Sequence, residues 1–211
     1  MVTALAVPDR IERSFIPDGD AGTIATVRRM ARLVITGATD PLVRDTASTV
    51  VAGVSGREPV QQAQAIRRWL ASHFQFLRDP HGAELLHSPR LLLTWVGQRG
   101  KVQADCDDAA ILGAALARAI GLKVRFVVVG FLAPSAPFRH VWAEASASSG
   151  PHAGEWVEFD VTRQAQAIPW DKISRTRFFD PDRLGTPLGS LVVLGVVAWL
   201  MAHWDSIFSR R

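Results

Sequence analysis

The chain has 211 residues and a net charge of +4 at pH 7, from 24 basic and 20 acidic side chains. This length predicts one domain with or without a short appendage, and an apolar content of 48% is ample for a packed core. The small basic excess is spread along the chain without a block of five basic residues, so nucleic-acid binding is not expected, and a single cysteine excludes an intramolecular disulfide.

The N-terminal region, residues 1–22, is expected to form an extended arm. Pro8, Pro17 and Gly19 disfavour a regular element there. No basic stretch precedes a long apolar one, so the region lacks the pattern of a Sec-type signal peptide.

Three helices are predicted between this arm and the cysteine. Apolar residues recur at helical spacing over residues 23–36. Asp40 and Pro41 are typical of an N-cap and a first helical turn, and they begin a helix that ends near Gly53. A third helix is predicted over about residues 58–74. We expect these helices to form a packing layer without chemistry of its own.

Shorter elements lead to the cysteine. Residues 75–88 contain a turn signal and are predicted to be irregular. Ser88 and Pro89 begin a short predicted helix, and residues 97–103 are predicted to form a loop. Residues 107–120 are apolar nearly all round, which predicts a central, buried helix with the cysteine at its start.

A β-sheet is predicted after this central helix. Its strands are expected over residues 123–131, 139–145 and 155–162, which are rich in β-branched and aromatic side chains. Residues 146–154 are small and polar and predict a hairpin turn. Residues 163–186 are predicted to be loop-like.

The C-terminal residues 184–211 form a long apolar segment. From Leu184 to Trp204 no side chain is charged unless His203 is protonated. A helix of this length would be roughly 30 Å long, about the thickness of the hydrocarbon layer of a bilayer. The segment predicts either a membrane anchor or a helix buried in the fold or in an assembly interface, and both alternatives stay open.

A lone thiol and two later polar side chains could together carry chemistry: Cys106, His140 and Asp160. A thiol attacks as its thiolate, and the free amides and dipole at a helix start favour an anion there. The neighbouring Asp105, Asp107 and Asp108 would oppose ionisation by repulsion. Acidic residues are also common in a first helical turn, which is their alternative explanation.

His140 begins one predicted strand, and Asp160 lies near the end of the next. Pairing the two strands as a hairpin brings both side chains close, so that the carboxylate could orient the imidazole. Taken singly, a buried cysteine or a strand histidine is more often a packing residue. No matching carboxylate signal and no metal-ligand pattern accompanies the other histidines, which are His73, His81, His87, His152 and His203.

Four blocks, in order, resemble those of the transglutaminase-like cysteine enzyme superfamily. Residues 105–109 (Asp-Cys-Asp-Asp-Ala) are similar to its Gly-Asp-Cys-Asp-Asp block, and residues 121–127 to its Gly-x-x-x-Arg-x-Val block. Residues 140–144 (His-Val-Trp-Ala-Glu) resemble its His-x-Trp-x-Glu strand, and residues 156–162 its Trp-x-x-x-Asp-Pro-Thr strand. The segment upstream, residues 76–89, looks most like members encoded in bacteria and bacteriophages.

The chain departs from the family pattern at three positions. Ala104 stands where the family has glycine, Val161 where it often has proline, and Phe76 where many members have tyrosine. None of these changes removes one of the three candidate catalytic residues.

The resemblance implies an α+β, papain-like transglutaminase core over residues 23–183, with residues 184–211 as a separate apolar helix. It implies Cys106 as nucleophile, His140 as general base and acid, and Asp160 as the residue that orients His140. The candidates for stabilising the oxyanion are the backbone amide of Cys106 and the side chains of Gln103 and Trp95.

The function that the resemblance implies is a cysteine peptidase or amidase. It would act on a peptide or a peptidoglycan-type amide through an acyl-enzyme, with no metal and no cofactor. The alternatives are a protein-crosslinking transamidase, or a catalytically silent structural component of a phage particle or a membrane-associated assembly. The expected location is the bacterial cytoplasm or the phage virion, and residues 184–211 could contact phage structural proteins or the inner membrane.

Overall fold

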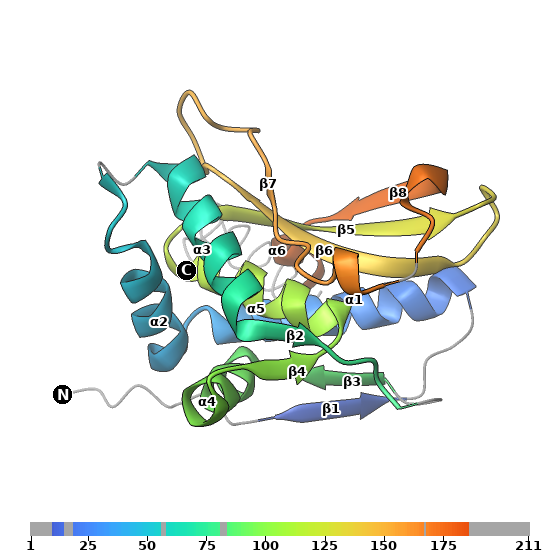
Figure 1. Cartoon of the computed structure of the whole chain (residues 1–211). Coiled ribbons are helices and arrows are strands. Elements are labelled where there is room, and N and C mark those ends of the chain that lie inside the picture. The colour runs from blue at the N-terminus through green and yellow to red at the C-terminus, as the bar shows by residue number, and fades with distance from the viewer. Residues whose placement is uncertain (1–9, 15–18, 56–57, 81–83, 167, 186–211) are drawn as a thin grey trace, which may run out of the picture.

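The computed structural model of the chain describes residues 10–14, 19–55, 58–80, 84–166 and 168–185. A four-stranded antiparallel sheet, in the order β7-β6-β5-β8, lies on one side of the central helix α5 (Cys106–Ala119). The strands are β5 (Lys123–Phe131), β6 (Phe138–Ser146), β7 (Val157–Glu158) and β8 (Ile173–Phe179). Figure 1 shows α4 (Pro89–Arg99) and two small sheets on the other side of α5.

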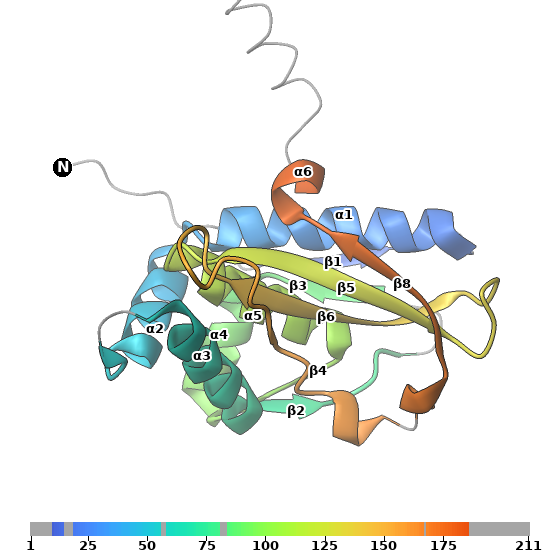
Figure 2. The same cartoon turned by 90° about the horizontal axis from the view of Figure 1, so that it is seen from above.

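The helices that precede the cysteine surround α5. They are α1 (Gly19–Gly37), α2 (Pro41–Val51) and α3 (Pro59–His73), and Figure 2 shows α1 and α3 on opposite sides of α5. The start of α2 is as predicted, because the Asp40 carboxylate accepts hydrogen bonds from the amides of Leu42 and Val43 at 2.9 and 3.4 Å. The predicted packing layer is therefore present.

Two small sheets were not predicted. One pairs β1 (Ile11–Ser14) with β3 (Glu84–His87), and the other pairs β2 (Phe74–Phe76) in parallel with β4 (Val102–Ala104). These strands have three or four residues each, too few to show an alternating pattern. The predictions of an irregular segment over 75–88 and a loop over 97–103 were therefore wrong in part. The predicted arm is also shorter, since α1 begins at Gly19.

The segment predicted to be loop-like after residue 162 contains β8 and a short helix, α6 (Pro181–Gly185). β8 pairs with β5 over Phe126 to Phe131 and forms an edge of the sheet. Buried and exposed residues do not alternate regularly along β8, and most of its residues are exposed. The sequence therefore carries only a weak strand signal. The third predicted strand is also shorter than expected, because β7 covers only Val157–Glu158.

The apolar segment predicted over residues 184–211 lies outside the described residues except for the last two residues of α6. Among the helices that the structure describes, none combines the length and hydropathy needed to cross a bilayer.

The core is built around α5, which is buried on all sides over most of its length. Gly113 lies where this helix meets the segment that carries the candidate aspartate. A Cβ atom at Gly113 would lie 2.9 Å from the Phe159 ring and 3.0 Å from the Leu70 side chain. The missing side chain thus allows Phe159, which is completely buried, to pack against the helix immediately before Asp160.

We predict that Gly113→Val lowers the free energy of unfolding by about 2–3 kcal/mol, because the added methyl groups overpack the contact with Phe159. Urea unfolding followed by circular dichroism measures the change. Gly97→Val in α4 is the control, since nothing lies within 4 Å of a Cβ there. Equal losses in the two variants would contradict the packing explanation.

Candidate active site

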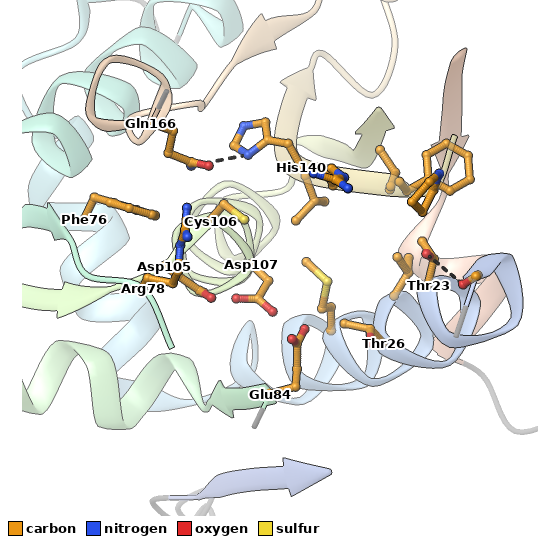
Figure 3. Close-up of a pocket in the computed structure, with 18 residues that line it drawn as sticks. Thr23, Thr26, Phe76, Arg78, Glu84, Asp105, Cys106, Asp107, His140 and Gln166 are labelled. Atoms are coloured by element: carbon orange, nitrogen blue, oxygen red, sulfur yellow. Dashed lines mark hydrogen bonds between the residues drawn. The ribbon is translucent and has the colours of Figure 1, made fainter. Parts of the chain in front are cut away.

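The three predicted residues come from three different elements. Cys106 is the first residue of α5 and is half-buried, His140 lies in β6, and Asp160 follows β7. Cys106 and His140 line the same cleft, which has a volume of about 580 Å³ and is drawn in Figure 3. The helix start and the sheet therefore bring the thiol and the imidazole to one cavity.

His140 is held by Asp160 on the side away from this cleft. The distance from His140 Nε2 to Asp160 Oδ2 is 2.8 Å, and both side chains are almost completely inaccessible to solvent. The second carboxylate oxygen, Oδ1, accepts hydrogen bonds from the backbone amide and the hydroxyl of Thr162, both at 3.1 Å. Thr162 thus holds one oxygen of the carboxylate, and the other oxygen holds Nε2 of the imidazole.

Two tryptophans confine the His140 ring. Trp170 makes an edge-on contact with a centroid distance of 4.9 Å, and Trp142 lies at 5.8 Å in the same strand as the histidine. The rings leave the imidazole little rotational freedom, so the nitrogen that is not bonded to Asp160, Nδ1, stays on the cleft side.

The environment of Cys106 favours the neutral thiol. Burial raises its pKa, and the negative charge of Asp105 raises it further, whereas a hydrogen bond from the Val141 backbone amide to the sulfur lowers it. The net effect is a pKa above the ordinary value of a thiol. The expected repulsion from neighbouring acids is therefore present, and the thiol needs a base to lose its proton.

Carboxyl groups form one wall of the cleft. Glu84, Asp105 and Asp107 all line it, and Figure 3 shows the Glu84 and Asp107 side chains facing one another. Burial and the charge of Asp105 raise the pKa of Asp107 well above its usual range, and burial also raises the pKa of Glu84. This side of the cleft is acidic, and the protonated form of Asp107 is favoured.

The carboxylate oxygens of Asp105, Asp107 and Asp108 lie within 4.8 Å of one another. Such a group could hold a cation, but two of its members already have other bonds. Asp108 binds His87, and Asp107 Oδ1 accepts the Asp108 amide at 3.0 Å. The absence of a metal from the function stays a prediction.

Asp108 has a structural role that the sequence analysis missed. Its oxygens accept hydrogen bonds from the His87 backbone amide at 2.9 Å and bond His87 Nδ1 at 2.5 Å, which links β3 to the start of α5. Burial lowers the pKa of His87, but the Asp108 hydrogen bond and charge outweigh it and the net shift is upward. Burial raises the pKa of Asp108 to about 6. The expectation that His87 lacks a carboxylate partner was therefore wrong.

The two predicted oxyanion side chains are not among the residues that line the cleft. Gln103 is exposed in β4 and donates a hydrogen bond to Gln75 Oε1 at 3.3 Å. Trp95 lies in α4 and packs edge-on against His87. Gln166 lines the cleft instead. No sequence pattern marks it, because it follows the irregular turn after Asp160.

Asp79 makes stability depend on pH. Burial and the charge of Asp105 raise the pKa of Asp79 to about 6, so folding favours its protonated form and this contribution to stability is lost as pH rises from about 4 through 6. We predict that Asp79→Asn, which keeps an acceptor for the Leu85 amide, gains stability relative to the wild type over this range.

The gain should level off above pH 6 at about 1 kcal/mol, allowing for solvent screening of a partly exposed carboxyl group. Urea unfolding between pH 4 and 8 measures it. The control is Asp20→Asn. The Arg175 hydrogen bond lowers the pKa of Asp20, so this variant should lose stability relative to the wild type as the pH rises, opposite to Asp79→Asn. A difference between Asp79→Asn and the wild type that does not change with pH would contradict the assignment.

None of the curated proteins compared with the chain matches it. The crystal structure of a candidate cysteine protease from Cytophaga hutchinsonii matches with 19% identity and a TM-score of 0.43, over 65% of this chain and 46% of that one. The chain thus spans less than half the length of that protein.

The family model for the transglutaminase-like superfamily matches residues 44–161, which is more than half of the chain and includes Cys106, His140 and Asp160. The match confirms the predicted α+β, papain-like core. The chain therefore belongs to the transglutaminase-like superfamily.

Proposed function

We propose that the protein is a cysteine peptidase or amidase that acts through Cys106, His140 and Asp160. One observation carries the proposal: Asp160 holds His140 by Nε2, and the ring and the Cys106 thiol share the cleft. A nucleophile, a base and a residue that orients the base are the parts required for thiol acyl transfer.

The first half of the reaction forms an acyl-enzyme. His140 Nδ1 takes the proton of Cys106 as the sulfur attacks an amide carbonyl carbon. The tetrahedral intermediate collapses, the carbon–nitrogen bond breaks, and His140 returns the proton to the leaving amine. Because the site favours the neutral thiol, the Cys106 proton must pass to His140 for the sulfur to attack. Asp160 stabilises the imidazolium that forms between the two steps.

The second half releases the product. Water loses a proton to His140 and attacks the thioester carbonyl carbon, and Cys106 leaves and recovers the proton from His140. The negative oxygen of both tetrahedral intermediates needs donors near the sulfur. The backbone amide of Cys106, at the free N-terminal end of α5, is the donor that the geometry supports best.

Transamidation is the second candidate, and the acidic wall of the cleft favours it. Glu84 and Asp105 would attract a lysine ammonium. After this group loses a proton to solvent, the neutral amine would attack the thioester in place of water, and its second proton would pass through His140 to the departing Cys106 sulfur. Peptidoglycan as substrate, a bacteriophage origin and a structural role of residues 184–211 in a virion or at a membrane remain further hypotheses. Among the described residues no observation favours them.

We predict that Cys106→Ala abolishes hydrolysis of amide substrates and the alkylation of the protein by iodoacetamide. His140→Asn and Asp160→Asn should keep the thiol and lower the rate by about 10²–10⁴-fold, because they remove or misorient the base. A library of peptide and peptidoglycan-type amides, assayed with and without added lysine amine, measures hydrolysis and transamidation by mass spectrometry.

The matched control is His152→Asn, because His152 lies outside the cleft and pairs with Glu155 near the surface. This variant should keep the wild-type rate. Activity that survives in Cys106→Ala would refute the assignment of the nucleophile, and a wild-type protein that cleaves or transfers none of the amides would refute the enzyme proposal. Co-purification with particle proteins and no activity would support the structural alternative.

A further inference from the structure

Gln166 completes a closed ring of side-chain hydrogen bonds around the candidate base. Its Nε2 lies 3.4 Å from His140 Nδ1 and 2.9 Å from Thr162 Oγ1. Thr162 Oγ1 donates to Asp160 Oδ1, and the other carboxylate oxygen bonds His140 Nε2. Figure 3 shows the Gln166 side chain facing the imidazole of His140, whereas Asp160 bonds the other ring nitrogen, Nε2.

The hydrogen bonds, as placed, correspond to one arrangement of protons. With its nitrogen toward the ring, the Gln166 amide can only donate, so in this arrangement His140 Nδ1 accepts and the ring proton lies on Nε2. The two hydrogens of the Gln166 amide then serve Nδ1 and Thr162, and the Thr162 hydroxyl proton serves Asp160. The hydrogens of the Gln166 amide and of the Thr162 hydroxyl are thus all used, and the Gln166 N–H must leave Nδ1 before Nδ1 can accept the thiol proton.

We propose that Gln166 is a positioning residue that hydrogen-bonds His140 in both of its protonation states, by turning its terminal amide through half a rotation. The terminal torsion of glutamine has a broad and roughly two-fold potential, so the turn exchanges nitrogen and oxygen at little cost. When the Cys106 proton has moved to Nδ1, the Gln166 oxygen accepts from Nδ1–H. It also accepts from the Thr162 hydroxyl.

Asp160 remains bonded in the second state. It loses the Thr162 hydroxyl but keeps the Thr162 backbone amide at 3.1 Å, and its bond with His140 becomes charge-assisted. A residue that satisfies both forms of the imidazole suits a base that must accept a proton and later return it. This last argument rests on the proposed function, whereas the hydrogen-bonded ring itself does not.

Other ionisable groups share the surroundings of His140. Asp160 contacts the ring directly, and the groups that line the same cleft are Cys106, Asp105, Asp107, Glu84, Arg78 and Arg139. The cleft is also lined by the hydroxyls of Thr23 and Thr26. Among the described residues, the side chain that hydrogen-bonds His140 Nδ1 is that of Gln166, whose amide can both donate and accept.

A pH titration of the full-length ¹⁵N-labelled protein, followed by NMR, tests the proposal. We predict that the side-chain amide resonances of Gln166, identified by their loss in Gln166→Leu, shift with the same midpoint as the His140 ring, identified by its loss in His140→Asn. The side-chain amide of Gln164, which is exposed on the same turn, is the internal control and should not shift at that midpoint.

Three variants give a second, independent measurement. Gln166→Glu replaces the amide by a carboxylate that only accepts, so it should raise the His140 midpoint by about one pH unit, a tenfold gain in proton affinity. Thr162→Val should uncouple the Gln166 amide from the His140 titration, and Thr162→Ser should retain the coupling. If a variant fails to fold, the wild-type titration decides alone.

A Gln166 amide that does not change across the His140 midpoint, or a His140 midpoint that Gln166→Glu leaves at the wild-type value, would overturn the proposal. Failure of the proposed function gives a different result. In that case Cys106 resists iodoacetamide and no amide is cleaved, while the coupled titration of Gln166 and His140 persists.

Discussion

The hydrogen bond between His140 and Asp160 is the interaction on which the candidate site depends. It joins β6 to the segment after β7 in the interior of the protein, where neither side chain meets solvent. Removing one partner would leave a buried polar atom of the other without its hydrogen bond, at a cost of about 1–3 kcal/mol. The neighbouring residues support the pair: Phe159 packs against α5 on one side of Asp160, and Thr162 holds the carboxylate on the other.

The electrostatics of the site oppose a resting thiolate. Burial, and to a smaller extent nearby carboxyl groups, raise the pKa of Cys106, and the Val141 amide offsets this only in part. The start of α5, which would favour an anion in isolation, is thus outweighed by the acids that surround it. The chemistry then depends on the position of His140 and on its neutral form, and this explains why bonds to both ring nitrogens matter.

The acidic residues at the start of α5 have separate structural tasks. Asp108 links α5 to β3 through His87, whereas Asp107 points into the cleft and shares its wall with Glu84. The same short segment therefore anchors the helix, carries the nucleophile and sets the charge of the cleft. A substitution there would change more than one of these properties at once.

The sequence by itself determined the parts whose physical signals are local. Helical spacing, the Asp40 cap and the β-branched run of residues 123–131 predicted the helices and the central strand, and four blocks of residues predicted the superfamily. Cys106, His140 and Asp160 were also named from the sequence alone.

Only the tertiary structure decided the rest, because it depends on contacts between distant residues. The edge strand β8, the short strands β1 to β4 and the His87–Asp108 pair are stabilised by partners far along the chain, so their own residues carry little signal. Gln166 likewise acquires its place only when the turn after Asp160 folds back over the cleft. Gln103 and Trp95 lie close to the cysteine in sequence, but their strand and helix hold them away from the cleft.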